Sequence, residues 1–138
     1  MKNFLLWLWQ LPQHLLALII WRFLKSSGKI ISVRRERNKR CITVDVPSWG
    51  VSLGQYVFMD QHYEGEDWNH EFGHSKQSLY CGWLYLLIIG IPSAVFNNLW
   101  DRLFHKKWDW EKRKQWYYSR WPENQADTLG NVQRYWDK

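Results

Sequence analysis

The chain has 138 residues, a length that fits one domain and excludes separate catalytic and regulatory modules. Its composition, with 46% hydrophobic and 23% charged residues, excludes a disordered or low-complexity protein. The net charge of +6 favours anionic partners such as lipid or nucleic acid. No nucleic-acid-binding module is recognisable, so no nucleic-acid partner is expected, whereas twelve Trp residues favour a membrane interface.

Residues 1–25 are predicted to form a hydrophobic anchor helix. The 19 residues between Lys2 and Arg22 include no Asp, Glu, Lys or Arg, and this length approaches a membrane span. Four residues near its middle argue against full insertion: Gln10, Pro12, Gln13 and His14. A kinked helix, or one lying in the membrane interface, is therefore the alternative to a transmembrane helix, and a cleaved signal peptide is a third interpretation.

A basic segment follows at residues 22–40. It holds eight Lys or Arg residues and a single Glu, a pattern that the anionic lipids of the cytoplasmic leaflet attract. We therefore expect a membrane-associated protein with membrane lipid as a partner and this segment on the cytoplasmic side. A solvated, highly charged hairpin is the other interpretation, and the two are compatible.

The rest of the chain, residues 26–138, is predicted to form an α+β zinc-site domain. Short β-like patterns at residues 29–33, 41–46 and 55–59 predict a β-hairpin and a third strand, because turn-forming Asn, Pro and Gly residues separate them. The next pattern predicts a helix over residues 68–80, which ends before a glycine.

A second uncharged stretch runs from Gln77 to Trp100. Its 24 residues would measure about 36 Å as one straight helix. Gly90 and Pro92 near its centre predict a break, so we expect a re-entrant or internally buried helical hairpin. Residues 100–121 interleave Trp and Tyr with Lys and Arg, which suits the lipid headgroup level; an ordinary amphipathic helix is the alternative.

The sequence His70-Glu71-Phe72-Gly73-His74 is an HExxH motif. On a helix, the i, i+4 spacing places both imidazoles on one face, where they can bind one Zn²⁺ ion. Glu71 then lies beside the metal-bound water and is the predicted general base. Gly73 weakens a helix by about 1 kcal/mol, so it suits a site that another backbone approaches closely.

A catalytic zinc site needs a third protein ligand and an open position for water. Glu123 is the best candidate, because Pro122 suits the first turn of a helix and because Glu123 and Asp127 face the same side at i, i+4. Asp127 is then placed to accept a hydrogen bond from the outer nitrogen of a zinc-bound imidazole. The alternative interpretation is two solvated acids on a surface helix.

The pattern His70-Glu71-x-x-His74 followed by Glu123-x-x-x-Asp127 resembles that of the gluzincin zinc metallopeptidases. With its hydrophobic surroundings it looks closest to the membrane-embedded CAAX prenyl protease and heat-shock membrane protease type. The resemblance implies zinc ligands at His70, His74 and Glu123 and a general base at Glu71. It also implies that Asp127 accepts a hydrogen bond from a zinc-bound histidine. It further implies that the strand at residues 55–59 lines the substrate-binding cleft and pairs with an extended substrate.

The function that the resemblance implies is a membrane-associated, zinc-dependent hydrolase that acts on a peptide or protein. Tyr117, Tyr118 and His105 are the candidates for stabilising the oxyanion. His74 and Glu123 must lie on the same side of a membrane, which is a further reason to expect a hairpin between them. The alternative function is a noncatalytic, metal-binding adaptor at the membrane surface.

Overall fold

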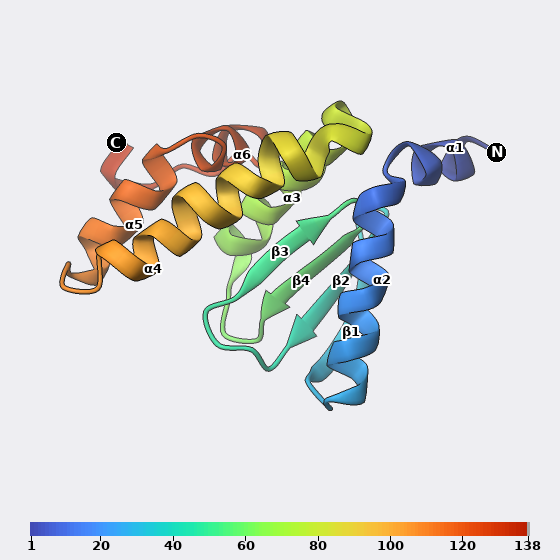
Figure 1. Cartoon of the computed structure of the whole chain (residues 1–138), viewed down its shortest axis with the longest axis horizontal. Helices are drawn as coiled ribbons and strands as arrows, with labels where there is room; N and C mark the ends of the chain where they lie inside the picture. The colour runs from blue at the N-terminus through green and yellow to red at the C-terminus, as the bar shows by residue number, and fades with distance from the viewer. Residues whose placement is uncertain (138) are drawn as a thin grey trace.

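The structure is a computed structural model that describes residues 1–137 and has an α+β fold (Figure 1). The expected fold class is therefore confirmed. The α-helices are α1 (Lys2–Trp9), α2 (Leu11–Ser26), α3 (Gly65–Cys81), α4 (Trp100–Phe104), α5 (Trp110–Ser119) and α6 (Glu123–Leu129). The strands are β1 (Ile30–Glu36), β2 (Lys39–Val44), β3 (Gly50–Leu53) and β4 (Tyr56–Asp60). Other helical segments are η1 (Gly82–Leu84), η2 (Leu86–Gly90), η3 (Pro92–Leu99) and η4 (Tyr135–Asp137).

The sheet is mixed, with the strand order β1-β2-β4-β3. Both hairpins, β1–β2 and β3–β4, are antiparallel, while β2 and β4 run parallel. Arg37 and Asn38 form the two-residue turn of the first hairpin with φ of 52° and 62°, which matches the twist of the flanking strands. The sequence predicted three strands. The strand it missed, β3, has only four residues, begins with Gly50 and ends just before Gly54, and is defined by its pairing with β4.

The two faces of the sheet are covered by different helices, because successive side chains of a strand point to opposite faces. Ile42, Val44 and Phe58 pack with Ala17 and Leu24 of α2. The same cluster includes Ile89 of η2 and Tyr85 just before it. On the other face, β2 and β4 pack against α3, in a cluster of Cys41, Val57, Met59, Trp68 and Phe72. The sheet is thus enclosed between α2 and η2 on one side and α3 on the other.

The chain reverses at Gly82, which ends α3 with a φ of 54°. From there η2, η3 and α4 continue in one direction as a long helix, which comprises residues 86–104 (Figure 1). The predicted break at Gly90 and Pro92 is wrong. Ile91 has helical dihedral angles, φ −65° and ψ −49°, and Pro92 begins η3, where its fixed φ fits the helical backbone.

The predicted anchor at residues 1–25 is two helices, α1 and α2, which meet at an angle of 82°. Within the described residues no single helix is both long and apolar enough to cross a membrane, whereas α1 and α2 taken together have that length and composition.

Candidate metal centre

Helix α3 places the two histidines of the motif on one buried face. The helix begins with a capping box, in which the Asp67 side chain accepts a hydrogen bond from the Glu64 N–H at 3.1 Å, an arrangement that fixes the helix start. His70 and His74 lie one turn apart, their ring centroids are separated by 4.7 Å, and both are buried. The helix and its spacing agree with the sequence prediction.

Helix α6 comes within van der Waals contact of α3 because Gly73 has no side chain. A Cβ atom at Gly73 would lie 1.8 Å from the carbonyl oxygen of Ala126, so any larger residue would separate the helices. The expected close approach of another backbone at Gly73 is confirmed. Because of this contact, Glu123 and Asp127, one turn apart on α6, reach the two imidazoles although about 50 residues separate them in sequence.

Three potential ligand atoms converge at the centre of this contact. The Oε2 atom of Glu123 lies 3.1 Å from His70 Nε2 and 2.9 Å from His74 Nε2. Zinc–nitrogen bonds of about 2.0–2.1 Å in a tetrahedral site hold ligand atoms about 3.3 Å apart. The spacing in the protein is therefore within a few tenths of an ångström of the spacing that a zinc ion requires.

The outer nitrogen of each imidazole is held by a different kind of partner. His70 Nδ1 lies 2.7 Å from Asp127 Oδ1, and Arg134 pairs with that carboxylate at 2.8 and 2.9 Å. His74 Nδ1 lies 2.7 Å from Gln77 Oε1. The Gln77 amide is oriented by the hydrogen bonds that its Nε2 donates to Pro122 O and to Gln125 Oε1, at 3.1 and 2.9 Å.

These contacts assign the protons of the two rings. Each Nδ1 donates its hydrogen to an oxygen, so in a neutral imidazole each Nε2 presents a lone pair. Both lone pairs then face the Glu123 carboxylate, an arrangement that repels unless a cation lies between them. The centre is thus built to hold positive charge, supplied either by protons or by a metal ion.

The electrostatics of the buried groups agree with this assignment. Burial alone would lower the pKa of His70, but the hydrogen bonds to Asp127 and Glu123 outweigh it and raise the pKa to about 10. Burial alone would raise the pKa of Glu123, but His74 and His70 outweigh it and hold the pKa well below its usual value. In the absence of a metal ion, protons therefore take the central position.

Glu71 faces the same centre from α3. Ligand atoms of His70, Glu71 and His74 all lie within 4.8 Å of one another. The Oε2 atom of Glu71 is buried and has no hydrogen-bond partner among residues 1–137, and burial raises the pKa of this carboxyl. An unpartnered buried oxygen beside converging ligand atoms fits a water molecule or a metal ion at this position.

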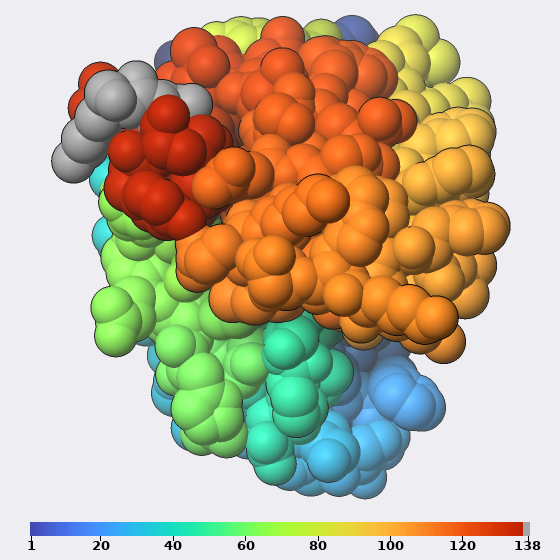
Figure 2. All heavy atoms as spheres, turned by 90° about the vertical axis from the view of Figure 1, so that its left-hand side faces the viewer, coloured from blue at the N-terminus to red at the C-terminus, as the bar shows by residue number. Residues whose placement is uncertain are grey.

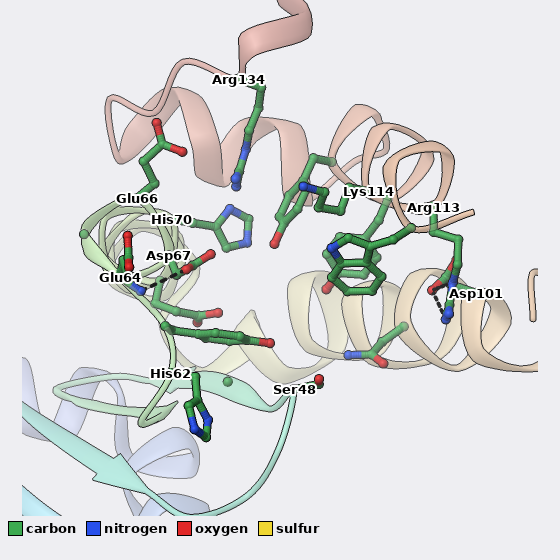
Figure 3. Close-up of a pocket in the computed structure, with 18 of the residues that line it drawn as sticks. Ser48, His62, Glu64, Glu66, Asp67, His70, Asp101, Arg113, Lys114 and Arg134 are labelled. Atoms are coloured by element: carbon green, nitrogen blue, oxygen red, sulfur yellow. Dashed lines mark hydrogen bonds and ion pairs between the residues drawn. The ribbon is translucent and has the colours of Figure 1, made fainter. Parts of the chain in front are cut away.

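A cleft of about 890 Å³ leads to the centre. His70 and Glu71 line it, and Tyr117 and Tyr118 form part of the opposite wall; Figure 3 shows His70 pointing into the space between α3 and the C-terminal helices. Figure 2 shows the face on which the orange residues of α5 meet the green start of α3. His105 is not among the residues that line this cleft in the described part of the chain; it pairs with Asp101 and stacks on a tryptophan.

The strand beside the cleft is not the one that was expected. Residues 55–59 fall almost entirely in β4, which lies between β2 and β3 and is paired on both sides, so its backbone has no free edge for a substrate. The edge strand next to the cleft is β3, and its first residue, Gly50, lines the cleft. A Cβ atom at Gly50 would lie 3.4 Å from Glu71 Oε1, which shows how close this edge is to the centre.

The structure brings together His70, His74, Glu123 and Asp127, with Glu71 beside them, as the sequence predicted. It adds two side chains that the sequence analysis missed. Gln77 follows His74 by three residues on the same helix, a spacing that indicates contact, whereas Ser93, which donates a hydrogen bond to Glu123 Oε1, gives no local signal. Comparison with protein-family models, with curated proteins and with solved structures gives no match for this chain.

Proposed function

We propose that the protein is a membrane-associated, zinc-dependent peptide hydrolase. The observation that supports it best is the convergence of His70 Nε2, His74 Nε2 and Glu123 Oε2 beside the unpartnered carboxylate of Glu71. Two imidazoles and one carboxylate are the donor set of many catalytic zinc sites. When bound, zinc would lower the pKa of a water molecule and polarise a substrate carbonyl.

The role of Glu71 follows from its position and its environment. Its Oε2 atom has no hydrogen-bond partner among residues 1–137, and burial raises the pKa of this carboxyl. A carboxylate of this kind accepts a proton from the attacking water and later donates it to the departing amine. Asp127 and Gln77 keep both imidazoles in the tautomer that presents Nε2 to the metal position.

Peptide is the proposed substrate because of the resemblance to gluzincins and because of the cleft. A volume of about 890 Å³ accommodates several side chains of an extended peptide. The edge strand β3 borders the cleft at its first residue, Gly50, which is half-buried. The end of β3 is buried, and Ser52 O accepts a hydrogen bond from the Tyr85 hydroxyl, so the start of this edge is the part at which an extended peptide could add as a further strand.

The test compares the full-length wild type with Glu71→Gln and His70→Ala, all purified in detergent. Zinc content is measured by elemental analysis and hydrolysis with a mixed library of quenched fluorescent peptides. We expect zinc in the wild type and in Glu71→Gln, with hydrolysis by the latter reduced at least about a hundredfold. His70→Ala should lose the metal, because it removes one of three protein ligands.

Two results would contradict the proposal. A wild type that binds no zinc and gains no stability from added zinc would exclude the metal centre. A Glu71→Gln variant with full zinc content and unchanged hydrolysis would exclude the assigned base. If the wild type binds zinc and cleaves no peptide of the library, the proposed activity is wrong and the metal-binding adaptor becomes the better hypothesis.

A further inference from the structure

The hydrophobic N-terminal segment has its apolar side chains outside and its polar side chains inside. On α1 and α2 the exposed residues include Ile19 and Phe23, which are 66% and 67% exposed. The polar residues in the middle of the segment, Gln10, Gln13 and His14, are all buried, whereas its exposed polar residues lie near its two ends. This is the reverse of the pattern of a helix whose outer side faces water.

Those buried polar residues bond to the rest of the protein. Gln13 donates hydrogen bonds to Ser78 Oγ and to Gly82 O at 3.1 and 2.7 Å, and Ser78 Oγ donates one to Gln10 Oε1 at 2.6 Å. His14 Nδ1 lies 3.0 Å from a backbone oxygen of α1, and its Nε2 accepts a hydrogen bond from the β3–β4 turn. In the sequence, these polar residues argued against insertion into a membrane. In the structure they are buried and bonded within the protein, so they do not contact what surrounds it.

The long helix, residues 86–104, has the same character. Its exposed side chains are mostly apolar: Leu87, Ile88, Ile91, Val95, Phe96, Leu99, Trp100, Leu103 and Phe104. Leu87, for example, is 63% exposed. Its polar Asn97 is buried and donates a hydrogen bond to the Trp121 carbonyl oxygen at 3.1 Å.

The outer sides of α2 and of the long helix are both apolar, and we call them together the apolar face. The inner sides of α2 and of η2 meet in one core cluster, which contains Ala17 and Leu24 of α2 and Ile89 of η2; in Figure 1, α2 crosses in front of the sheet and the long helix extends away from it in front of α3. Exposed apolar surface of this extent is rare on proteins surrounded by water. Something other than water must cover it.

The corner where the two helices start is also apolar, and its indole donors are satisfied. Trp9 Nε1 donates a hydrogen bond to Leu79 O, and Trp83 Nε1 donates one to Leu8 O, both at 2.7 Å. The two rings are about half exposed, so each presents carbon atoms to the outside while its only polar atom is bonded within the protein.

The charges around the apolar face favour a lipid bilayer as the occupant. Exposed basic residues gather where each helix ends: Arg22, Lys25 and Lys29 at α2, and Arg102, Lys106 and Lys107 at the long helix. Residues 1–25 contain no acidic residue, and the one acid of the long helix, Asp101, is buried and paired with Arg113. A second copy of the chain would bring like charges together without acidic partners, whereas anionic headgroups would match them.

We propose that the apolar face lies in the hydrocarbon of a bilayer, with the basic helix ends at anionic headgroups. This extends the membrane association of the proposed function by naming the surface and its orientation. It rests on residues outside the metal centre, so zinc content and lipid binding can succeed or fail separately. Because Asn98 and Arg102 of the long helix also line the cleft, the cleft then opens near the headgroup level.

The test reconstitutes the full-length protein by detergent removal and measures flotation with two kinds of vesicle, phosphatidylcholine alone and equal parts of phosphatidylcholine and phosphatidylglycerol. The test variant, Ile19→Glu with Leu87→Glu, charges two well exposed positions of the apolar face. The control, Ser32→Glu with Gln133→Glu, makes the same charge change at exposed positions elsewhere. Far-ultraviolet circular dichroism and thermal unfolding of each protein in detergent report whether it has folded.

We expect the wild type and the control to float with mixed vesicles, and the test variant to bind at least tenfold less while its circular dichroism spectrum matches that of the wild type. On phosphatidylcholine alone, binding of the wild type should fall at least tenfold. Equal flotation of test variant and control would overturn the proposal. So would a wild type that stays dimeric and unbound after detergent removal, because a second copy would then cover the apolar face.

Discussion

At the scale of single residues, the two imidazoles differ in what lies behind them. His70 is backed by a carboxylate, Asp127, whose charge is shared with Arg134, while His74 is backed by the neutral amide of Gln77. Both partners fix the tautomer, but only the carboxylate also increases the basicity of its imidazole. Glu123 differs from both, since its oxygen is a proposed ligand and touches both Nε2 atoms.

We predict from this a graded loss of zinc affinity. Glu123→Gln replaces the only carboxylate among the three proposed ligands and should weaken binding most. Asp127→Asn should weaken it by about 10- to 100-fold, the usual effect of changing a group behind a metal ligand. The measurement is competition for zinc with a chromophoric chelator. If Glu123→Gln bound zinc as tightly as the wild type, Glu123 would not be the third ligand.

A second prediction separates substrate contact from metal binding. The ring of Tyr118 lies 5.1 Å from that of His70 at the cleft wall, and burial raises the pKa of its hydroxyl, which stays protonated. As an oxyanion donor it would be worth about 10²- to 10³-fold in kcat. Tyr118→Phe should therefore lower kcat with zinc content unchanged, and Tyr135→Phe, at an exposed position, should lower neither. An unchanged kcat for Tyr118→Phe would leave Tyr117 as the candidate.

At the scale of elements, the contact between α3 and α6 positions the proposed third ligand. We predict that Gly73→Ala lowers the free energy of unfolding by about 1–3 kcal/mol or more, because the added Cβ would overlap the Ala126 carbonyl oxygen. The displaced α6 should also bind zinc more weakly. Gly65→Ala, in the first turn of the same helix, is the control, since no atom lies within 4 Å of its Cβ position. Thermal unfolding and zinc competition measure both effects, and equal behaviour of the two variants would contradict the interpretation.

The sequence predicted those elements that local patterns determine. Both α3 and α6 followed from capping residues and from the i, i+4 spacing of His70 with His74 and of Glu123 with Asp127. The sequence-based prediction failed where long-range contacts determine the structure. Pro92 predicts a break by local rules, yet it begins η3 within a continuous helix, and β3 is a strand only because β4 pairs with it.

The order of the strands could not be predicted from the sequence for the same reason. The central position of residues 55–59 could be recognised only with the knowledge that the second hairpin places β4 beside β2. The inward direction of Gln13 and His14 likewise depends on partners that lie more than 40 residues away in sequence. Patterns of hydrophobic residues identify an apolar segment, but they do not show which of its sides the fold covers.

At the scale of the whole molecule, the proposed metal centre joins two parts of the chain. Helix α3 is packed on the sheet through Trp68 and Phe72, whereas α6 reaches the rest of the protein chiefly through α3. A metal ion held by ligands from both helices would therefore bind only the assembled pair. It would stabilise that assembly by about 2.7 kcal/mol when free zinc exceeds the dissociation constant a hundredfold.

We predict that removal of zinc loosens the C-terminal part of the protein first. Hydrogen exchange of the detergent-solubilised wild type, with zinc and with a chelator, should show faster exchange of α6 after chelation, because its packing against α3 and α5 then lacks the link through the metal ion. The β1–β2 hairpin contains none of the proposed ligands and should exchange equally in both states. His70→Ala should exchange like the chelated protein whether or not zinc is added. If chelation changed the hairpin as much as α6, the metal would stabilise the fold as a whole instead of joining two of its parts.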